Sequence, residues 1–192
     1  KKVTAEHYFS TMPVKDLVEA MGSAVPEQVQ KIAGSLSYRD FITVGLLCDK
    51  LLIKNNSHRR TLNHLVPDNW IYIQEPDVKV GRLQIFNNWS PYMVSDPEKV
   101  WIGMEYFVQE GDGFWTMADE ELQRYAILEL EKIGIIDSGD VVDSVSIRIK
   151  KAYPSYFGSY LHFDRVKEWL MTISNLDCIG QRDAPLQQHG SQ

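Results

Sequence analysis

Two tyrosines that flank a proline are the residues of this sequence best suited to hold a polar ligand. Tyr153 and Tyr156 lie on either side of Pro154, whose ring restricts the local backbone. A phenolic hydroxyl can donate a hydrogen bond to a phosphate or another polar group. The pattern therefore predicts substrate contacts from Tyr153 and Tyr156, although half-buried tyrosines at the end of a strand are an equally good interpretation.

Arg82, Trp89 and Tyr92 form a second candidate group, because they lie on or just after a predicted strand. A guanidinium suits phosphate or carboxylate, so Arg82 could bind an anionic part of a substrate. An exposed cross-strand ion pair is the commoner alternative. Trp89 and Tyr92 could form a pocket wall, or Trp89 could cap the sheet core. Glu105 lies on an apolar strand, where alternation leaves open whether it is a buried acid or points to solvent.

No residue spacing predicts a metal site or a catalytic triad. Cys48 and Cys178 are the only cysteines, and neither belongs to a ligand-spaced motif. His64 and His162 have no partner at such spacing, so both are interpreted as structural. The cysteine usage favours a reduced, cytoplasmic protein, with a disulfide left open.

Charge and hydropathy exclude two further classes. The net charge of −6 argues against a nucleic-acid binder. The one basic cluster, His58–Arg60 with His64, is interpreted as a solvated loop. No apolar run approaches the roughly 20 residues of a membrane span.

The elements that must position these residues alternate between strand and helix periodicities. Strand patterns are expected at 6–11, 41–53, 70–74, 82–87, 100–108, 141–152 and 176–179. Helix patterns are expected at 14–21, 26–32, 119–133 and 163–173. Within 141–152, Val145, Ile147 and Ile149 alternate with polar residues, which predicts a half-buried strand. The fold class is therefore α+β: an antiparallel mixed sheet with helices on one side, flanked by a lone strand at each end.

Four segments, in this order and spacing, resemble FAD-dependent flavoproteins of the amine-oxidase, protoporphyrinogen-oxidase and UDP-galactopyranose-mutase superfamily. They are Tyr8–Pro13 (YFSTMP), Gly81–Met93 followed by Trp101–Tyr106, Ala152–Tyr156 (AYPSY) and Asn175–Gly180 (NLDCIG). The resemblance implies that 81–106 are substrate-domain strands and that the tyrosines of 152–156 face a substrate diphosphate.

The same resemblance implies a division of the chain. Residues 1–14 would be a remnant of the FAD-binding α/β domain, 15–174 the substrate-binding domain, and 175–180 the strand that returns to the FAD-binding domain. Gly180 would then contact the cofactor. Flavoproteins of this type open with a G-x-G-x-x-G turn, which is absent here, so the FAD site would lie mainly outside this sequence.

The tail at 181–192 departs from the family pattern. Suitable codons for these residues, read one base later, encode Arg-Gly-Met-His-Arg-Tyr-Asn-Asn-Met-Asp-His, which resembles the family's continuation. We therefore expect an out-of-frame tail, and a genuine polar terminus is the alternative.

These observations lead to one principal functional hypothesis and two rivals. The chain is expected to be an inactive substrate-binding fragment of an FAD-dependent oxidoreductase, with FAD bound only by the full-length parent. The rivals are a fragment of a UDP-sugar mutase and a non-catalytic α+β binding module. The fragment hypothesis predicts that Tyr8–Met12 and Leu176–Gly180 form a small sheet. It also predicts an apolar patch, left for the missing FAD domain, that could drive self-association.

Overall fold

The computed structural model describes residues 2–155 and 158–179. The predicted contacts at Tyr156 and Gly180 and the tail at 181–192 lie outside these residues. The chain divides into two compact units, one formed by Asp40–Lys150 and the other by the segments before and after it. The predicted boundaries of an FAD-binding remnant, at 14 and 175, stay a prediction.

The larger unit is built on a five-stranded sheet in the order β3-β4-β5-β2-β6. Its strands are β2 (Tyr38–Cys48), β3 (Trp70–Tyr72), β4 (Arg82–Ile85), β5 (Val100–Val108) and β6 (Val141–Pro154). The pairs β2–β5, β4–β5 and β3–β4 are antiparallel. A bond from the Asp49 amide to the Asp140 carbonyl joins the end of β2 to the start of β6, so this pair is antiparallel too. The predicted α+β class with an antiparallel sheet is confirmed.

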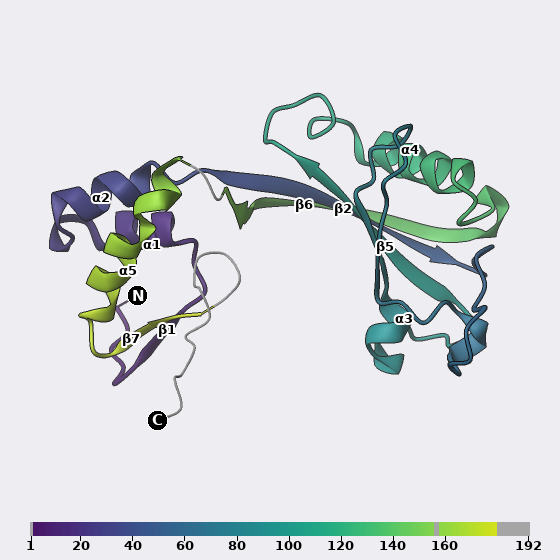
Figure 1. Cartoon of the computed structure of the whole chain (residues 1–192), viewed down its shortest axis with the longest axis horizontal. Helices are drawn as coiled ribbons and strands as arrows, with labels where there is room; N and C mark the ends of the chain where they lie inside the picture. The colour runs from purple at the N-terminus through teal and green to yellow at the C-terminus, as the bar shows by residue number, and fades with distance from the viewer. Residues whose placement is uncertain (1, 156–157, 180–192) are drawn as a thin grey trace. The chain divides into compact units, whose positions relative to one another are not determined.

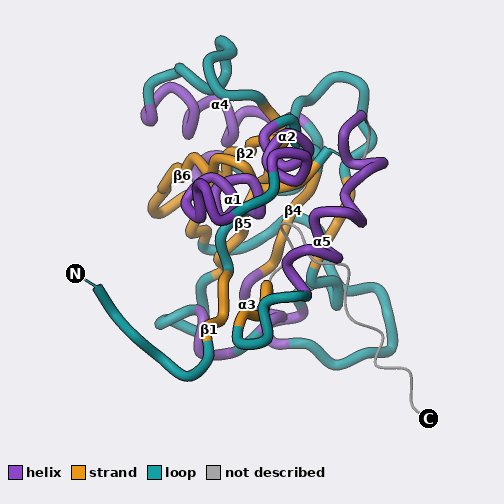
Figure 2. The backbone as a smooth tube through the Cα atoms, turned by 90° about the vertical axis from the view of Figure 1, so that its left-hand side faces the viewer, coloured by secondary structure: helices purple, strands orange, loops and turns teal. Residues whose placement is uncertain are grey.

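Helix α4 (Asp119–Lys132) covers one face of this sheet (Figures 1 and 2). Leu122, Ala126 and Leu130 recur every fourth residue, so they share one side of the helix. All three are fully buried in a core with strand residues such as Ile102 and Met104. The helix begins with three acidic residues, which favours its N-terminus. It ends before Gly134, whose positive φ of 72° suits glycine.

Among the described residues, only the strand predicted at 100–108 has the expected bounds, and two of the differences have a clear cause. The run expected at 41–53 is a strand only over Tyr38–Cys48. Its last apolar residues follow the turn after Cys48, and Leu51 is buried in the same core without pairing as a strand. The apolar residue types of this run indicate that the side chains are buried, and residues of both strands and loops can be buried.

The strand expected at 82–87 stops at Ile85 and continues as the short helix α3 (Phe86–Trp89). The buried Asn87 side chain explains this end. Its amide donates to the Lys99 carbonyl at 2.8 Å, and its Oδ1 accepts from the Trp101 amide at 3.0 Å. A side chain thereby satisfies backbone groups at the start of β5 that a longer β4 would have paired.

Strand β6 does not bury its apolar row as a half-buried strand usually would. Val145 and Ile147 are 41% and 52% exposed. The polar row includes Arg148, which donates from Nε to the Trp115 carbonyl at 2.7 Å and pairs with Asp119 at the start of α4. The uncovered apolar row therefore lies on the side opposite α4.

Among its described residues, the smaller unit contains three α-helices and a pair of short strands. Its helices are α1 (Val14–Met21), α2 (Glu27–Gly34) and α5 (Phe163–Met171). Their buried residues form one cluster that includes Val18, Ala33 and Val166. Strands β1 (Tyr8–Ser10) and β7 (Leu176–Cys178) pair in parallel, which confirms the predicted small sheet.

The structure also bears on membrane-spanning helices, metal-ligating clusters and disulfides. Within the described residues no helix is long and apolar enough to cross a bilayer. The same part of the chain holds no cluster of three metal-ligating side chains. Neither Cys48 nor Cys178 forms a disulfide within the described residues.

Candidate functional site

The candidate site is the face of the five-stranded sheet that points away from α4, called here the open face. Strand register and alternation place its residues. They are Phe41, Thr43, Gly45, Trp70, Tyr72, Arg82, Gln84, Trp101, Gly103, Glu105, Phe107, Val145 and Ile147. The face therefore combines a polar centre on β4 and β5 with aromatic and aliphatic side chains.

An ion pair forms the polar centre. Arg82 and Glu105 are directly opposite on β4 and β5 and are 9% and 2% exposed. The Arg82 Nε donates to Glu105 Oε2 at 2.8 Å, and Nη2 donates to the same oxygen. Gln84 donates from its side-chain amide to Glu105 Oε1. Both carboxylate oxygens are thus satisfied, as a buried charge requires.

Aromatic rings enclose the Arg82 guanidinium. Its Cζ lies 4.7 Å from the Trp70 ring centre and 5.7 Å from that of Tyr72, within the range of cation–π attraction. The Tyr72 hydroxyl is 3.5 Å from Nη1. Trp89 meets Trp70 edge to face, with ring centres 5.0 Å apart. The two tryptophans and the arginine form one continuous cluster.

Glycines allow further aromatic rings to lie against the sheet. A Cβ added to Gly103 would be 2.8 Å from the Phe86 ring, and one added to Gly81 would be 2.9 Å from the Phe107 ring. A Cβ on Gly45 would be 3.0 Å from the Trp101 ring. The three rings occupy the space that side chains would fill, so the open face is covered with flat aromatic groups.

Glu129, on α4, fixes the backbone that leads into β4. Its buried carboxylate accepts from the amides of Lys79 and Val80, and from the Tyr106 hydroxyl at 3.0 Å. Burial, and then the nearby Glu129, raise the pKa of Tyr106, which therefore remains a hydrogen-bond donor. Arg82 follows two residues after Val80, so α4 helps to position the polar centre from behind the sheet.

The predicted ligand residues meet different surroundings. Arg82 and Trp89 are brought into one cluster through Trp70. Tyr92 lies on the 3₁₀ turn Pro91–Met93 and is 95% exposed. Tyr153 is half-buried near the end of β6, in the smaller unit. Their roles toward a ligand stay predictions.

Sequence reasoning overlooked Trp70 and Tyr72 and left Glu105 undecided. The signal was available in the pairing of two adjacent strands. Trp70 pairs with Gln84 and Tyr72 with Arg82 across the β3–β4 hairpin, which puts all four on one face. Pairing the two predicted strands across the turn at 75–81 would have placed Trp70 and Tyr72 on the same face as Arg82.

The arrangement suits binding of a flat or partly apolar molecule. Exposed faces of Trp70, Tyr72 and Trp89 can stack on a ring or pack on a hydrocarbon. Arg82 is already held by Glu105, so it offers a fixed positive group and has little freedom to swing toward a ligand.

Comparison with known proteins gives one kind of match. No protein-family model and no curated protein matches the chain. Among solved structures, reduced UDP-galactopyranose mutase matches with a TM-score of 0.65 and 19% identity, covering 88% of this chain and 34% of that chain. A protein assigned as a protoporphyrinogen oxidase, from Exiguobacterium sp. 255-15, matches with a TM-score of 0.55 and 16% identity, covering 93% of this chain and 38% of that chain.

The chain has the fold of the matched parts of these two structures. The predicted resemblance is thereby confirmed for the fold. The chain spans little more than a third of the length of the two structures.

Proposed function

We propose that the open face is the substrate-side wall of the active site of an FAD-dependent oxidoreductase. The observation that carries this proposal is an aromatic surface around the buried Arg82–Glu105 pair, in which Trp70, Tyr72 and Phe107 are 43%, 66% and 43% exposed. Soluble proteins rarely leave such a surface exposed without a partner or ligand for it. In this proposal the rest of the enzyme, including the FAD-binding region, lies outside this chain.

The side chains of the open face would bind and orient a substrate and exclude water. Trp70 and Trp89 offer stacking surfaces, and Arg82 a fixed positive charge for an electron-rich or anionic group. Bound FAD would supply the transfer of electrons. The chain would then have no redox activity alone.

The β1–β7 pair supports a larger assembly. Parallel sheets are normally covered on both faces and contain more than two strands. Here two three-residue strands pair in parallel, and Tyr8 and Phe9 are exposed. In the proposal this pair is the edge of the sheet of an FAD-binding domain.

A UDP-sugar mutase is the second candidate. It is favoured by the higher TM-score of the mutase structure and by the tyrosine–proline segment that begins at Tyr153. In that case flavin would act on the sugar without net oxidation of the substrate.

The test uses the gene product extended in both directions, purified and examined for a flavin absorbance spectrum. An oxidoreductase predicts bound FAD that amines, porphyrinogens or isoprenoids reduce under anaerobic conditions. A mutase predicts that dithionite-reduced enzyme interconverts UDP-galactopyranose and its furanose. An extended product that binds no flavin would contradict both and leave the non-catalytic binding module.

A further inference from the structure

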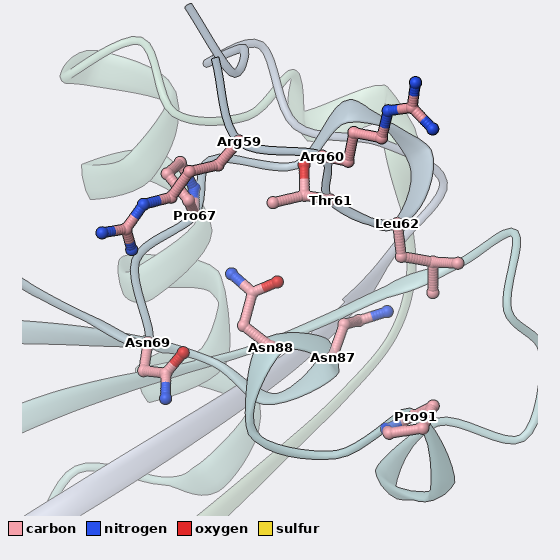
Figure 3. A pocket seen from close by; sticks show the side chains of 9 residues that line it. All are labelled: Arg59, Arg60, Thr61, Leu62, Pro67, Asn69, Asn87, Asn88 and Pro91. Atoms are coloured by element: carbon pink, nitrogen blue, oxygen red, sulfur yellow. The ribbon is translucent and has the colours of Figure 1, made fainter. Parts of the chain in front are cut away.

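A cavity of about 400 Å³ lies in the larger unit, between the loop at 59–67 and helix α3 (Figure 3). This volume is within the roughly 300–1,000 Å³ of small-molecule sites. The lining residues are Arg59, Arg60, Thr61, Leu62, Pro67, Asn69, Asn87, Asn88 and Pro91. Polar groups dominate the wall, in contrast to the aromatic open face.

The segment that forms one wall is basic in an acidic protein. Residues 50–74 contain four lysines and arginines and a single acid, Asp68, whereas the whole chain carries a net charge of −6. Positive charge concentrated at a concave surface attracts anions. The location of the charge therefore indicates an anionic ligand.

Hydrogen bonds hold this wall in place without involving the guanidinium of Arg59. The Asn55 amide donates to the Arg59 carbonyl at 2.7 Å, and the Arg59 amide donates to Ser57 Oγ at 3.2 Å. Asn88 donates to the carbonyls of Val66 and Asp68, at 2.7 and 2.9 Å. The Arg59 guanidinium itself makes no hydrogen bond or ion pair within the part of the chain that the structure describes.

The backbone of the loop is strained next to the cavity. Asn63 and His64 both have positive φ, 49° and 57°, without being glycines. Residues in such backbone conformations cluster at functional sites. The Asn63 side chain donates to the Pro97 carbonyl, which helps to hold the strained turn.

Orientation distinguishes the two arginines. Figure 3 shows Arg59 and Asn69 on the same side of the cavity and Asn88 pointing into its middle, while Arg60 points away from both asparagines. Arg59 and the amide of Asn69, which also has no hydrogen bond from its side chain within the described residues, are the donors available to a ligand.

We propose that this cavity binds the oxyanion group, phosphoryl or carboxyl, of a small molecule, with Arg59 as its principal ligand and Asn69 as a second donor. A guanidinium presents paired N–H groups in the geometry that such oxyanions accept. The site is separate from the Arg82–Glu105 centre and requires no flavin.

Calorimetric titration of the purified chain with inorganic pyrophosphate, and separately with citrate, tests the proposal. Arg59→Gln is expected to weaken binding by at least about tenfold, because it removes a charge-assisted bond. Asn69→Ala is expected to weaken it by roughly three- to tenfold, in keeping with one neutral hydrogen bond. Tighter binding of pyrophosphate would identify the bound group as phosphoryl, and tighter binding of citrate would identify it as carboxyl.

Lys54→Gln is the matched control, since it removes one positive charge from the same segment at a residue that does not line the cavity. It is expected to change affinity by no more than about twofold, through long-range attraction alone. Equal loss in Arg59→Gln and Lys54→Gln would overturn the proposal in favour of unspecific attraction, as would absence of binding of both anions to the unchanged chain. Arg59→Gln keeps the wall folded, because the loop bonds to residue 59 use its backbone. Circular dichroism melting checks that expectation.

Discussion

The two faces of the five-stranded sheet bury different kinds of side chain. One face is aliphatic and is covered by α4, with Leu122, Leu130 and Ile102 fully buried. The open face buries the charged pair Arg82–Glu105 among aromatic rings and leaves Trp70 and Tyr72 substantially exposed. The covered face is packed into a core, whereas the open face keeps aromatic side chains exposed around its buried ion pair, as the proposed contact with a ligand would require.

Removing one charge of the buried pair is expected to have the largest effect. Glu105→Ala leaves the Arg82 guanidinium buried without its carboxylate, and loss of one partner of such a pair costs about 3–5 kcal/mol. Urea unfolding monitored by tryptophan fluorescence measures the change in free energy of unfolding.

Glu110→Ala is the control for that substitution. Glu110 pairs with Lys150, and both side chains are more than half exposed. Exposed pairs contribute about 0–1 kcal/mol. Similar losses in the two variants would mean that the pair on the open face is screened by water and is no fixed centre.

An isoleucine truncation on each face sharpens the comparison further. Ile102→Ala, on the covered face, should cost about 2–5 kcal/mol because it leaves a cavity under α4. Ile147→Ala, on the open face, should change stability by about 0.5 kcal/mol or less, since the side chain is half exposed. Thermal unfolding of both variants measures the difference, and equal losses would show that the open face is covered in solution, for instance by self-association.

Adding one methyl group tests the aromatic covering of the open face. Gly103→Ala would place a Cβ against the Phe86 ring and should cost about 1–3 kcal/mol through overpacking. Gly113→Ala is the matched control, because no atom lies within 4 Å of its added Cβ and its φ is not positive. An unchanged melting temperature for Gly103→Ala would indicate that the Phe86 ring moves freely.

The smallest expected effect is the change of stability with pH that Cys48, on the covered face, causes. Burial, followed by the charges of Asp140 and Asp49, raises the pKa of Cys48 from 9.0 to about 12. The folded state keeps this proton while the unfolded state releases it, so the contribution is absent below pH 9 and stability falls as pH rises from 9 toward 12. Native chain at pH 8 should therefore react with a thiol reagent only at Cys178, which is partly exposed. Rapid reaction of both thiols would show that the covered face opens.

Periodicity in the sequence was sufficient for α1, α2, α4 and α5 and for the existence of most strands, but not for the short helix α3. Leu122, Ala126 and Leu130 predict the buried side of α4 because a helix repeats locally every 3.6 residues. The resemblance to the flavoprotein superfamily predicted that the two end segments form a small sheet, but not that their strands run in parallel. Strand ends were less predictable: β4 stops at Ile85 because the Asn87 side chain bonds β5, which is a long-range contact.

The residues themselves determined an α+β chain with an arginine, tryptophans and tyrosines available for binding, because residue type and period are local properties. Only the tertiary structure decided which of them meet. Pairing across three strands brings Trp70, Arg82 and Glu105 together, and α4 decides which face is covered. The apolar row of β6 demonstrates the reason: an alternating pattern shows that a strand has two different faces, but the partner that packs on one of them determines which face is buried.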